Sequence, residues 1–477
     1  MRSRLAALAA FLVLLPPAAS AQAQAAPARA VTRATAADTT WVRRCALYEV
    51  NVRDFSPTGD LRGLRLGLDR IQLSGANVIW VMPVQPVGVL NRKGTLGSPY
   101  SLRDYDAIDP AFGDTADFRS LVRAAHARGL KVILDWVPDH TAWDAVWIHD
   151  HPDWYVHDDS GRISVPRDKQ GHLTDWTDVA QLDYHNPALR AAMIAAMRRW
   201  LVGYDLDGFR VDVAHFIPDD FWREAIADLR ASVPRRILML AEAGELEMHR
   251  SGFDLTYGWD AYGRLKEVWR GVLADSFARA ERTLLDSMPP GGMRMRFTTN
   301  HDETAWDNPP VVLFGGSAGD RAAFVAMALL PGRPLLYDGQ EVESPQKLGL
   351  FERAAIAWRQ PHAQEARAFY RSVLHLARTD SAFVSGAFVP VQTSTPGEVI
   401  AYRRGDAMVL VNARNNGVRV MVSDADVDRM RDLLTGRTQY GDWVSLPAYG
   451  AVVLARRAPV AAPARRPAAA RPVPAPR

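Results

Sequence analysis

The sequence is poor in cysteine and in lysine. A single cysteine, Cys45, in 477 residues excludes an intrachain disulfide framework and a zinc site built on cysteines. The chain holds five lysines, and Lys131 stands at the start of an expected strand rather than at its end. Because a Schiff-base aldolase built on a barrel needs a lysine where a strand ends, the sequence argues against that chemistry.

The chain also carries little excess charge, and the excess positive charge lies at its two ends. The whole sequence has a formal net charge of +3. Without residues 1–38 and 458–477, which are rich in arginine, the remaining residues 39–457 carry a net charge of −4. A mildly acidic folded part removes the main support for nucleic-acid binding.

The first 21 residues are expected to form a cleaved signal peptide. Arg2 and Arg4 precede an apolar run that Pro16 ends, and small residues around Ser20 suit cleavage. The run is about half of the roughly 20 residues that a membrane span needs. We therefore expect a secreted or periplasmic protein without a membrane span, in which a flexible leader at 22–38 precedes the folded part.

The middle of the chain alternates apolar runs with amphipathic stretches, as strands alternate with helices. Acids after expected strands recur about 30 residues apart or at multiples of that spacing, which predicts an α/β fold, a (β/α)8 TIM barrel over 39–383. An open doubly wound sheet usually has a Gly-rich turn after its first strand, and 51–55 is not one. The strands expected are 45–50, 77–82, 131–135, 207–211, 237–241, 294–298 and 334–337.

Three further segments complete the expected organisation. About 45 extra residues between the third strand and the next predict a small inserted domain at 141–181. Short alternating runs split by Gly, Asn and Asp predict a C-terminal antiparallel β-sandwich domain at 384–457. The Pro/Ala/Arg segment 458–477 cannot bury enough surface to fold and is expected to be disordered.

Four acids stand where expected strands end. In a barrel of this kind, the catalytic residues lie at the carboxyl ends of the strands. The four acids are Asp135, Asp212, Glu242 and Asp302. Arg210 faces the same side of its strand as Asp212 and is expected to keep that carboxyl ionised. Glu242 follows an apolar run, so burial is expected to raise its pKa. One ionised and one protonated carboxyl is the pair that glycoside hydrolysis requires.

Histidines stand beside two of these acid-bearing motifs. His140 and His301 are expected to supply hydrogen bonds to sugar hydroxyls. Each acid alone could be a helix cap or an ion-pair partner. Four acids at one end of successive strands, with His and Arg beside them, favour a functional site.

With these acids and their neighbours in place, the sequence resembles the α-amylase family of retaining glycoside hydrolases, glycoside hydrolase family 13. The resemblance follows the family's order over about 46–455. It is carried by Asp135–His140, Gly208–Asp212, Glu242, Asn300–Asp302 and Gln181–Pro187, and by flanking stretches at 48–55, 79–83, 97–105 and 336–341.

The resemblance implies a reaction and a role for each acid. Asp212 would attack the anomeric carbon and form a covalent glycosyl-enzyme, Glu242 would act as the acid and then the base, and Asp302 would stabilise the transition state. The implied substrates are the α-glucosidic bonds of maltooligosaccharides or starch-like α-glucans. Glu245, three residues after Glu242, is the rival acid/base.

Binding roles are implied as well. Tyr100 resembles the tyrosine that stacks under the sugar in the reacting subsite, and Asp135 and Arg210 would orient the nucleophile. In the expected insert, five large aromatics could be sugar platforms or could form the core of the insert itself: Trp143, Trp147, Trp154, Tyr155 and Trp176.

No cofactor is expected for the reaction, but a structural calcium ion is possible. Asp139 stands where calcium-binding members of the family carry asparagine. An aspartate can also bind calcium through oxygen, so the departure weakens the match without excluding the ion.

Two other functions remain open. A glucanotransferase would form the same covalent intermediate and resolve it with a sugar hydroxyl instead of water. A catalytically inactive glucan-binding protein is the second, and the presence of all three acids, Asp212, Glu242 and Asp302, argues against it.

Overall fold

A computed structural model of the protein describes residues 41–423 and 426–457. The expected signal peptide, the leader and the Pro/Ala/Arg segment at 458–477 lie outside these residues. In the described part of the chain, no helix combines the length and apolarity that crossing a membrane requires.

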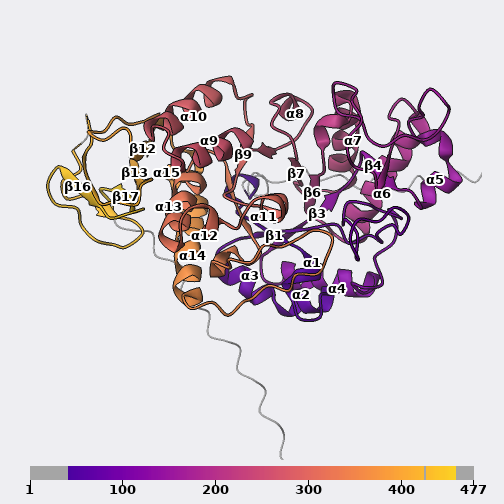
Figure 1. Ribbon diagram of the computed structural model, residues 1–477, viewed down its shortest axis with the longest axis horizontal. Helices are drawn as coiled ribbons and strands as arrows, with labels where there is room; N and C mark the ends of the chain where they lie inside the picture. Colours follow the sequence, from indigo (N-terminus) through magenta and orange to yellow (C-terminus); the bar gives the residue numbers. More distant parts are fainter. Residues whose placement is uncertain (1–40, 424–425, 458–477) are drawn as a thin grey trace, which may run out of the picture. The chain divides into compact units, whose positions relative to one another are not determined.

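Eight parallel strands close into a barrel, which confirms the predicted fold (Figure 1). The order around the ring is β1-β10-β9-β8-β7-β6-β3-β2, so β7 lies directly across the barrel from β1. The barrel strands are β1 (Leu47–Val50), β2 (Val78–Val81), β3 (Lys131–Trp136), β6 (Gly208–Val211), β7 (Leu238–Ala241), β8 (Leu255–Tyr257), β9 (Met293–Arg296) and β10 (Arg333–Tyr337).

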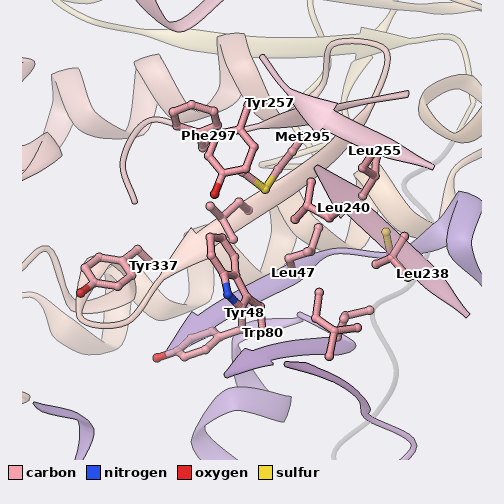
Figure 2. Packing of buried hydrophobic residues seen from close by; sticks show 14 of the residues in the cluster. Leu47, Tyr48, Trp80, Leu238, Leu240, Leu255, Tyr257, Met295, Phe297 and Tyr337 are labelled. Atoms are coloured by element: carbon pink, nitrogen blue, oxygen red, sulfur yellow. The ribbon is translucent and has the colours of Figure 1, made fainter. Parts of the chain in front are cut away.

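The side chains of these strands form the centre of the core. Figure 2 shows Leu47, Trp80 and Leu240 pointing into the barrel from different strands. Because helices cover the outside of the sheet, both faces of each strand are buried, and the strands read as nearly continuous apolar runs. Cys45, just before β1, is fully buried, and burial raises the pKa of its thiol to about 12, as suits an inert packing residue.

Helices surround the barrel and connect its strands (Figure 1). Residues 61–74 form two helices, which Gly67 separates, and a Cβ at Gly67 would overlap the ring of Phe55. The α-helices are α1 (Val52–Phe55), α2 (Leu61–Leu66), α3 (Leu68–Ser74), α4 (Thr115–His126), α5 (Val146–Asp150), α6 (Pro187–Gly203), α7 (Asp219–Ser232), α8 (Glu247–Arg250), α9 (Trp259–Trp269), α10 (Asp275–Ser287), α11 (His301–Trp306), α12 (Pro310–Leu313), α13 (Ser317–Ala328), α14 (Ala363–Thr379) and α15 (Ser381–Ser385).

The connections between strands differ greatly in length. Residues 242–254 join β7 to β8 and hold one α-helix, the four-residue α8. The connections after β2, at 82–114, and after β10, before α14, at 338–362, are longer and hold no α-helix. Long loops at the carboxyl ends of barrel strands are where such folds build their sites.

Two antiparallel elements lie outside the barrel. The insert after β3 begins and ends with the paired strands β4 (His140–Ala142) and β5 (Val179–Gln181). After α15, the sheet order is β11-β12-β13-β17-β15, and β14 pairs with β16. These strands are β11 (Phe388–Pro390), β12 (Val399–Arg404), β13 (Ala407–Asn412), β14 (Val418–Met421), β15 (Arg431–Asp432), β16 (Trp443–Leu446) and β17 (Ala451–Ala455).

The C-terminal sheet is fixed to the barrel through α13. Tyr402 on β12 donates its hydroxyl hydrogen to the carbonyl of Ala326, 3.0 Å away. Arg404 donates from Nη1 to the carbonyl of Leu329 at 2.9 Å. Both donors are buried side chains that bind helix-end carbonyls, so they satisfy groups that a helix leaves unpaired.

Candidate active site

A cavity of about 190 Å³ opens at the carboxyl ends of the barrel strands. Six of the eight residues that the sequence predicted for the site line it: Tyr100, His140, Asp212, Glu242, His301 and Asp302. The other two, Asp135 and Arg210, are fully buried next to these lining residues. The structure therefore brings all eight together from elements far apart in the sequence.

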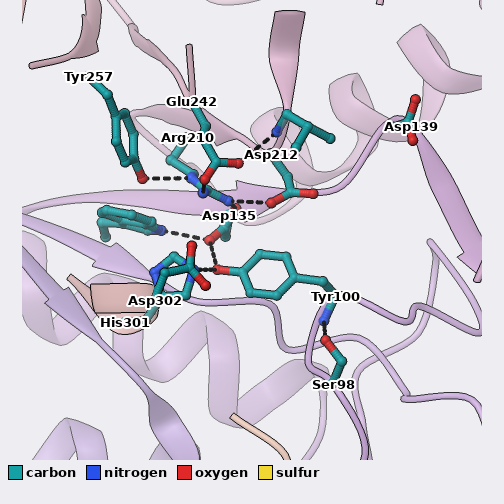
Figure 3. Close-up of polar contacts among 12 residues, drawn as sticks. Ser98, Tyr100, Asp135, Asp139, Arg210, Asp212, Glu242, Tyr257, His301 and Asp302 are labelled. Atoms are coloured by element: carbon teal, nitrogen blue, oxygen red, sulfur yellow. Dashed lines mark hydrogen bonds and ion pairs between the residues drawn. The ribbon is translucent and has the colours of Figure 1, made fainter. Parts of the chain in front are cut away.

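Arg210 lies at the centre of this cluster (Figure 3). Its Nη1 lies 2.8 Å from Oδ1 of Asp135 and 2.9 Å from Oδ1 of Asp212, and its Nη2 lies 2.9 Å from Oε1 of Glu242. Strand pairing explains the arrangement, because Asp135 on β3 is the direct neighbour of Arg210 on β6. One fully buried guanidinium thus compensates three carboxyl groups.

A chain of hydrogen bonds runs through His301 to Asp135. His301 Nδ1 lies 2.5 Å from Oε1 of Glu49, and its Nε2 lies 2.7 Å from the Tyr100 hydroxyl. The Tyr100 hydroxyl donates to Oδ2 of Asp135 at 3.0 Å, which leaves it to accept from His301. Trp80 donates from Nε1 to the same Oδ2 at 3.0 Å. The ring of Tyr100 is therefore held by hydrogen bonds at its hydroxyl end.

His301 is an imidazolium ion at neutral pH. Burial lowers its pKa, but the negative charges of Asp302 and Glu49 outweigh burial and raise the pKa to about 9. Burial also raises the pKa of Glu49, whose Oε2 has no hydrogen-bond partner in 41–423 or 426–457. The larger charge partner of His301 is Asp302, with Oδ2 3.3 Å from Nε2.

The pKa shifts of Asp212 and Glu242 run opposite to the directions predicted from the sequence. Burial and the neighbouring charge of Glu242 raise the pKa of Asp212 well above its ordinary value, and Arg210 only partly offsets them. Burial raises the pKa of Glu242 too, but Arg210 and the Val213 N–H, which donates to Oε2 at 2.8 Å, bring it below its ordinary value. The prediction missed that Glu242 also reaches Arg210.

Comparison with known proteins agrees with the fold. Residues 33–251 match the family model for the α-amylase catalytic domain. A maltogenic α-amylase, AmyB from Thermotoga neapolitana, is similar in structure, with a TM-score of 0.74 and 28% identity over 87% of this chain and 97% of that chain. The chain belongs to the α-amylase family.

Curated relatives in the α-amylase family are longer than this chain. The α-amylase MalA from Haloarcula japonica is 30% identical over 402 residues, which cover 78% of this chain and 55% of MalA. The trehalose synthase/amylase TreS from Mycobacterium tuberculosis is 33% identical over 212 residues, covering 38% of this chain and 34% of TreS. The chain thus spans between a third and just over half of the length of these relatives.

The charge on His301 gives the protein a stability that depends on pH. A histidine whose pKa is raised on folding stabilises the native state fully below about pH 6.5 and loses that effect as pH rises through about 9. Raising the pH from 6.5 to 9.5 should therefore lower the melting temperature. The free energy of unfolding should fall by up to about 3 kcal/mol, since one pKa unit is worth about 1.4 kcal/mol.

Thermal melts of the wild type and of His301→Gln over this pH range test this expectation. The wild-type curve should slope downward above pH 7, and the variant should lack most of that slope. Equal slopes in the two proteins would contradict the charged state of His301.

Asp139, the residue at which the sequence departs from the calcium-binding members of the α-amylase family, lies next to His140. Asp139 is buried, lies apart from the acids around Arg210 (Figure 3), and has His140 Nδ1 as a neighbour 3.2 Å from Oδ2. Nowhere in 41–423 or 426–457 do three or more His, Cys, Asp or Glu side chains form a group that could hold a metal ion.

Glu245, the rival acid/base, points elsewhere. It pairs with Lys169 of the insert at 2.6 Å, its side chain is 43% exposed, and it is not among the residues that line the cavity. Glu242, 2.9 Å from the same guanidinium as Asp212, is the glutamate positioned beside the candidate nucleophile.

The aromatics of the insert divide between the two expected roles. Trp154 and Tyr155 are buried in the hydrophobic core, and Trp147 packs against Tyr105 with ring centroids 4.4 Å apart. Trp176 lines the cavity and stacks on Phe216, with centroids 5.9 Å apart. One of the five is therefore positioned to contact a ligand, while Trp147, Trp154 and Tyr155 pack in or against the main hydrophobic core.

Several residues of the site were not predicted from the sequence. Glu49 and Trp80, on β1 and β2, hold His301 and Asp135, and Tyr257 accepts from Nε of Arg210 at 3.1 Å. An acid within an otherwise apolar strand, as at Glu49, was the available signal. Lys93 and Asp178, which also line the cavity, lie on loops where no pattern marked them.

Proposed function

We propose that the protein is an exported retaining glycoside hydrolase that cleaves α-glucosidic bonds of maltooligosaccharides or starch-like α-glucans. The observation that carries this proposal is that Asp212, Glu242 and Asp302 all line one cavity, with Arg210 paired to the first two. The names of the relatives, α-amylases among them, support the substrate class. Export rests on the features of residues 1–21.

The reaction that this geometry supports has two steps. Asp212 attacks the anomeric carbon while Glu242 protonates the leaving oxygen, and the bond to Asp212 is then hydrolysed by a water molecule that Glu242 deprotonates. The first step needs an ionised Asp212 and a protonated Glu242, whereas in the free site the pKa of Asp212 is raised and the pKa of Glu242 is lowered. Both pKa values must therefore shift when the substrate binds, and the charge of Arg210 favours an ionised Asp212.

The spacing of the two carboxyls supports retention. Both contact the terminal nitrogens of one guanidinium, and the Asp212 carboxyl is itself a hydrogen-bond partner that lowers the pKa of Glu242. Inverting glycosidases hold their carboxyls about 6.5–9.5 Å apart to admit a water molecule between them and the sugar, whereas retaining ones hold them about 5 Å apart. Their contacts with the two terminal nitrogens of one guanidinium fit the shorter spacing.

The remaining residues are assigned to sugar binding. Asp302, which is partly exposed beside the His301 imidazolium, would accept hydrogen bonds from ring hydroxyls that tighten in the transition state. Tyr100, held at its hydroxyl by His301 and Asp135, would offer its ring face to the sugar. His140 would donate to a hydroxyl from the side of the insert. No cofactor takes part in these steps.

The stereochemistry of the first product tests the proposal. With maltoheptaose as substrate, the sugar released with a new reducing end should be the α-anomer, because two displacements at one carbon restore its configuration. Proton NMR within the first minutes, before mutarotation, measures this. An initial β-anomer would contradict retention and with it the role of Asp212 as nucleophile.

Transglycosylation is the second candidate, and the name of the relative TreS, a trehalose synthase/amylase, favours keeping it. A glucanotransferase would resolve the glycosyl-enzyme with a sugar hydroxyl. Product profiling on maltose and maltooligosaccharides, with and without an added acceptor sugar, separates the two functions: products longer than the substrate indicate transfer.

A further inference from the structure

Two long loops meet beside the cavity and form one side of its mouth. The loop after β2 and the loop after β10 are joined by a backbone hydrogen bond from Leu96 N to Phe351 O at 3.0 Å. Thr95 donates its backbone N–H to Oε1 of Glu352 at 2.8 Å, and its hydroxyl donates to the other oxygen of that carboxylate. The two loops are therefore linked by main chain and side chain together.

A buried arginine also joins the two loops. Nη1 of Arg53 donates to the carbonyl of Gly97 in the first loop at 3.2 Å and to that of Leu350 in the second at 3.1 Å. Gly94 allows the close approach, because it has a φ of +62° and a Cβ there would lie 2.7 Å from Cβ of Phe351. The contact between the loops is thus stabilised by a buried side chain and by close packing at a glycine.

An ion pair extends this side of the mouth to the insert. Nζ of Lys93 lies 3.0 Å from Oδ1 of Asp178, whose side chain is 5% exposed, and donates to the carbonyl of Asp175 at 3.4 Å. Nζ also lies 6.0 Å from the centre of the Phe351 ring. Lys93, Asp178 and Phe351 all line the cavity, and we call these three residues the wall.

The wall stands on the side of the barrel opposite Glu242. The loops that form it follow β2 and β10, which flank β1, and they are joined by the insert after β3, whereas Glu242 follows β7, directly across the ring from β1. If Glu242 protonates the leaving oxygen, the departing part of the glucan lies toward β7. The sugar held by Asp212 then directs its non-reducing side toward the wall.

We propose that the wall ends the cavity beyond the reacting sugar, so that the enzyme attacks α-glucans from their non-reducing ends and releases short products. This inference rests on the proposed function. The size of the cavity agrees with it, because pockets for drug-sized ligands span about 300–1,000 Å³, while this one, at about 190 Å³, suits a single ring. An endo-acting enzyme would need an open groove on both sides of the acids.

Blocking the non-reducing end of a substrate provides the decisive experiment. The probes are p-nitrophenyl α-maltoheptaoside and the same compound with a 4,6-O-ethylidene group on its non-reducing glucose, and products are separated by chromatography. The wild type should cleave the blocked probe with a kcat/KM at least about 100-fold lower, the scale on which a closed pocket rejects a surplus group. The free probe should give glucose from the start, because the cavity holds one ring on the non-reducing side of the cleaved bond.

The two possible failures of this experiment are distinguishable. If neither probe is cleaved, the proposed function itself fails. If both are cleaved at similar rates into products of mixed length, the enzyme is endo-acting and the wall does not close the cavity, while the proposed function stands.

Substitutions in the wall test whether its residues cause the lower kcat/KM for the blocked probe. Lys93→Ala and Asp178→Asn should each reduce the ratio of kcat/KM for the free probe to kcat/KM for the blocked probe about 10-fold or more. The matched control is Arg198→Ala, which removes the ion pair between α6 and Asp228 of α7, outside the cavity, and should leave the ratio unchanged. Folded wall variants, as judged by melting, that keep the wild-type ratio would overturn the role of the ion pair.

Discussion

Replacing Asp212 with asparagine is expected to abolish turnover and to leave the fold intact. The amide has nearly the shape of the carboxyl but cannot act as a nucleophile at the anomeric carbon. Loss of one member of a catalytic set lowers kcat by about 10⁴-fold or more, and we expect a loss on that scale. Reducing-sugar release from maltoheptaose measures it.

Stability is the internal control for this variant. Asp212 is one of three carboxyls around one guanidinium, and its removal leaves Arg210 paired to Asp135 and Glu242. The melting temperature should therefore stay close to that of the wild type. A folded Asp212→Asn protein with turnover within 10-fold of the wild type would remove Asp212 from the role of nucleophile.

Removing Arg210 is expected to cost both stability and turnover. Its guanidinium is fully buried between three carboxyl groups. Breaking a buried ion pair by removing one partner leaves an uncompensated charge and costs about 3–5 kcal/mol, so Arg210→Gln should be destabilised on that scale in urea titrations. Turnover should be lost too, because the carboxyls would take up protons or move apart.

A second substitution isolates the electrostatic cause. In the Arg210→Gln background, Asp135→Asn removes one of the stranded carboxylates and should restore part of the lost stability, which simple loss of packing would not allow. The exposed pair of Arg198 offers a matched control, since Arg198→Gln should change stability by less than about 1 kcal/mol. An Arg210→Gln protein as stable as that control would contradict the account of the cluster.

The barrel could be predicted because its strands are buried on both faces. Such strands appear as apolar runs, and each run found in the sequence became a strand. The strand that escaped, β8 (Leu255–Tyr257), has three residues and follows β7 after a connection too short for a full helix, so neither its length nor its spacing stood out. Gly67 separates α2 from α3 and lies against the Phe55 ring, a contact that no local sequence pattern contains.

The site residues could be predicted as far as strand ends determine them. Asp135, Asp212 and Glu242 each stand at or just after the end of a strand, and the closed ring brings such positions together. The directions of their pKa shifts could not be predicted, because these depend on Glu242 reaching the same guanidinium as Asp212. Lys93 and Asp178 meet only through the folding of two loops 85 positions apart in sequence numbering, a contact that composition and periodicity do not encode.

The short connection between β7 and β8 leaves the mouth of the barrel with an unequal rim. Residues 242–254 form little structure on the side where the departing glucan is proposed to lie, whereas the loops after β2 and β10 are long and linked on the opposite side. Little structure on that side is thus available to select among acceptor halves of the substrate. Because doubling the length of a loop costs only about 0.6 kcal/mol, a segment grafted there could create new acceptor specificity without rebuilding the barrel.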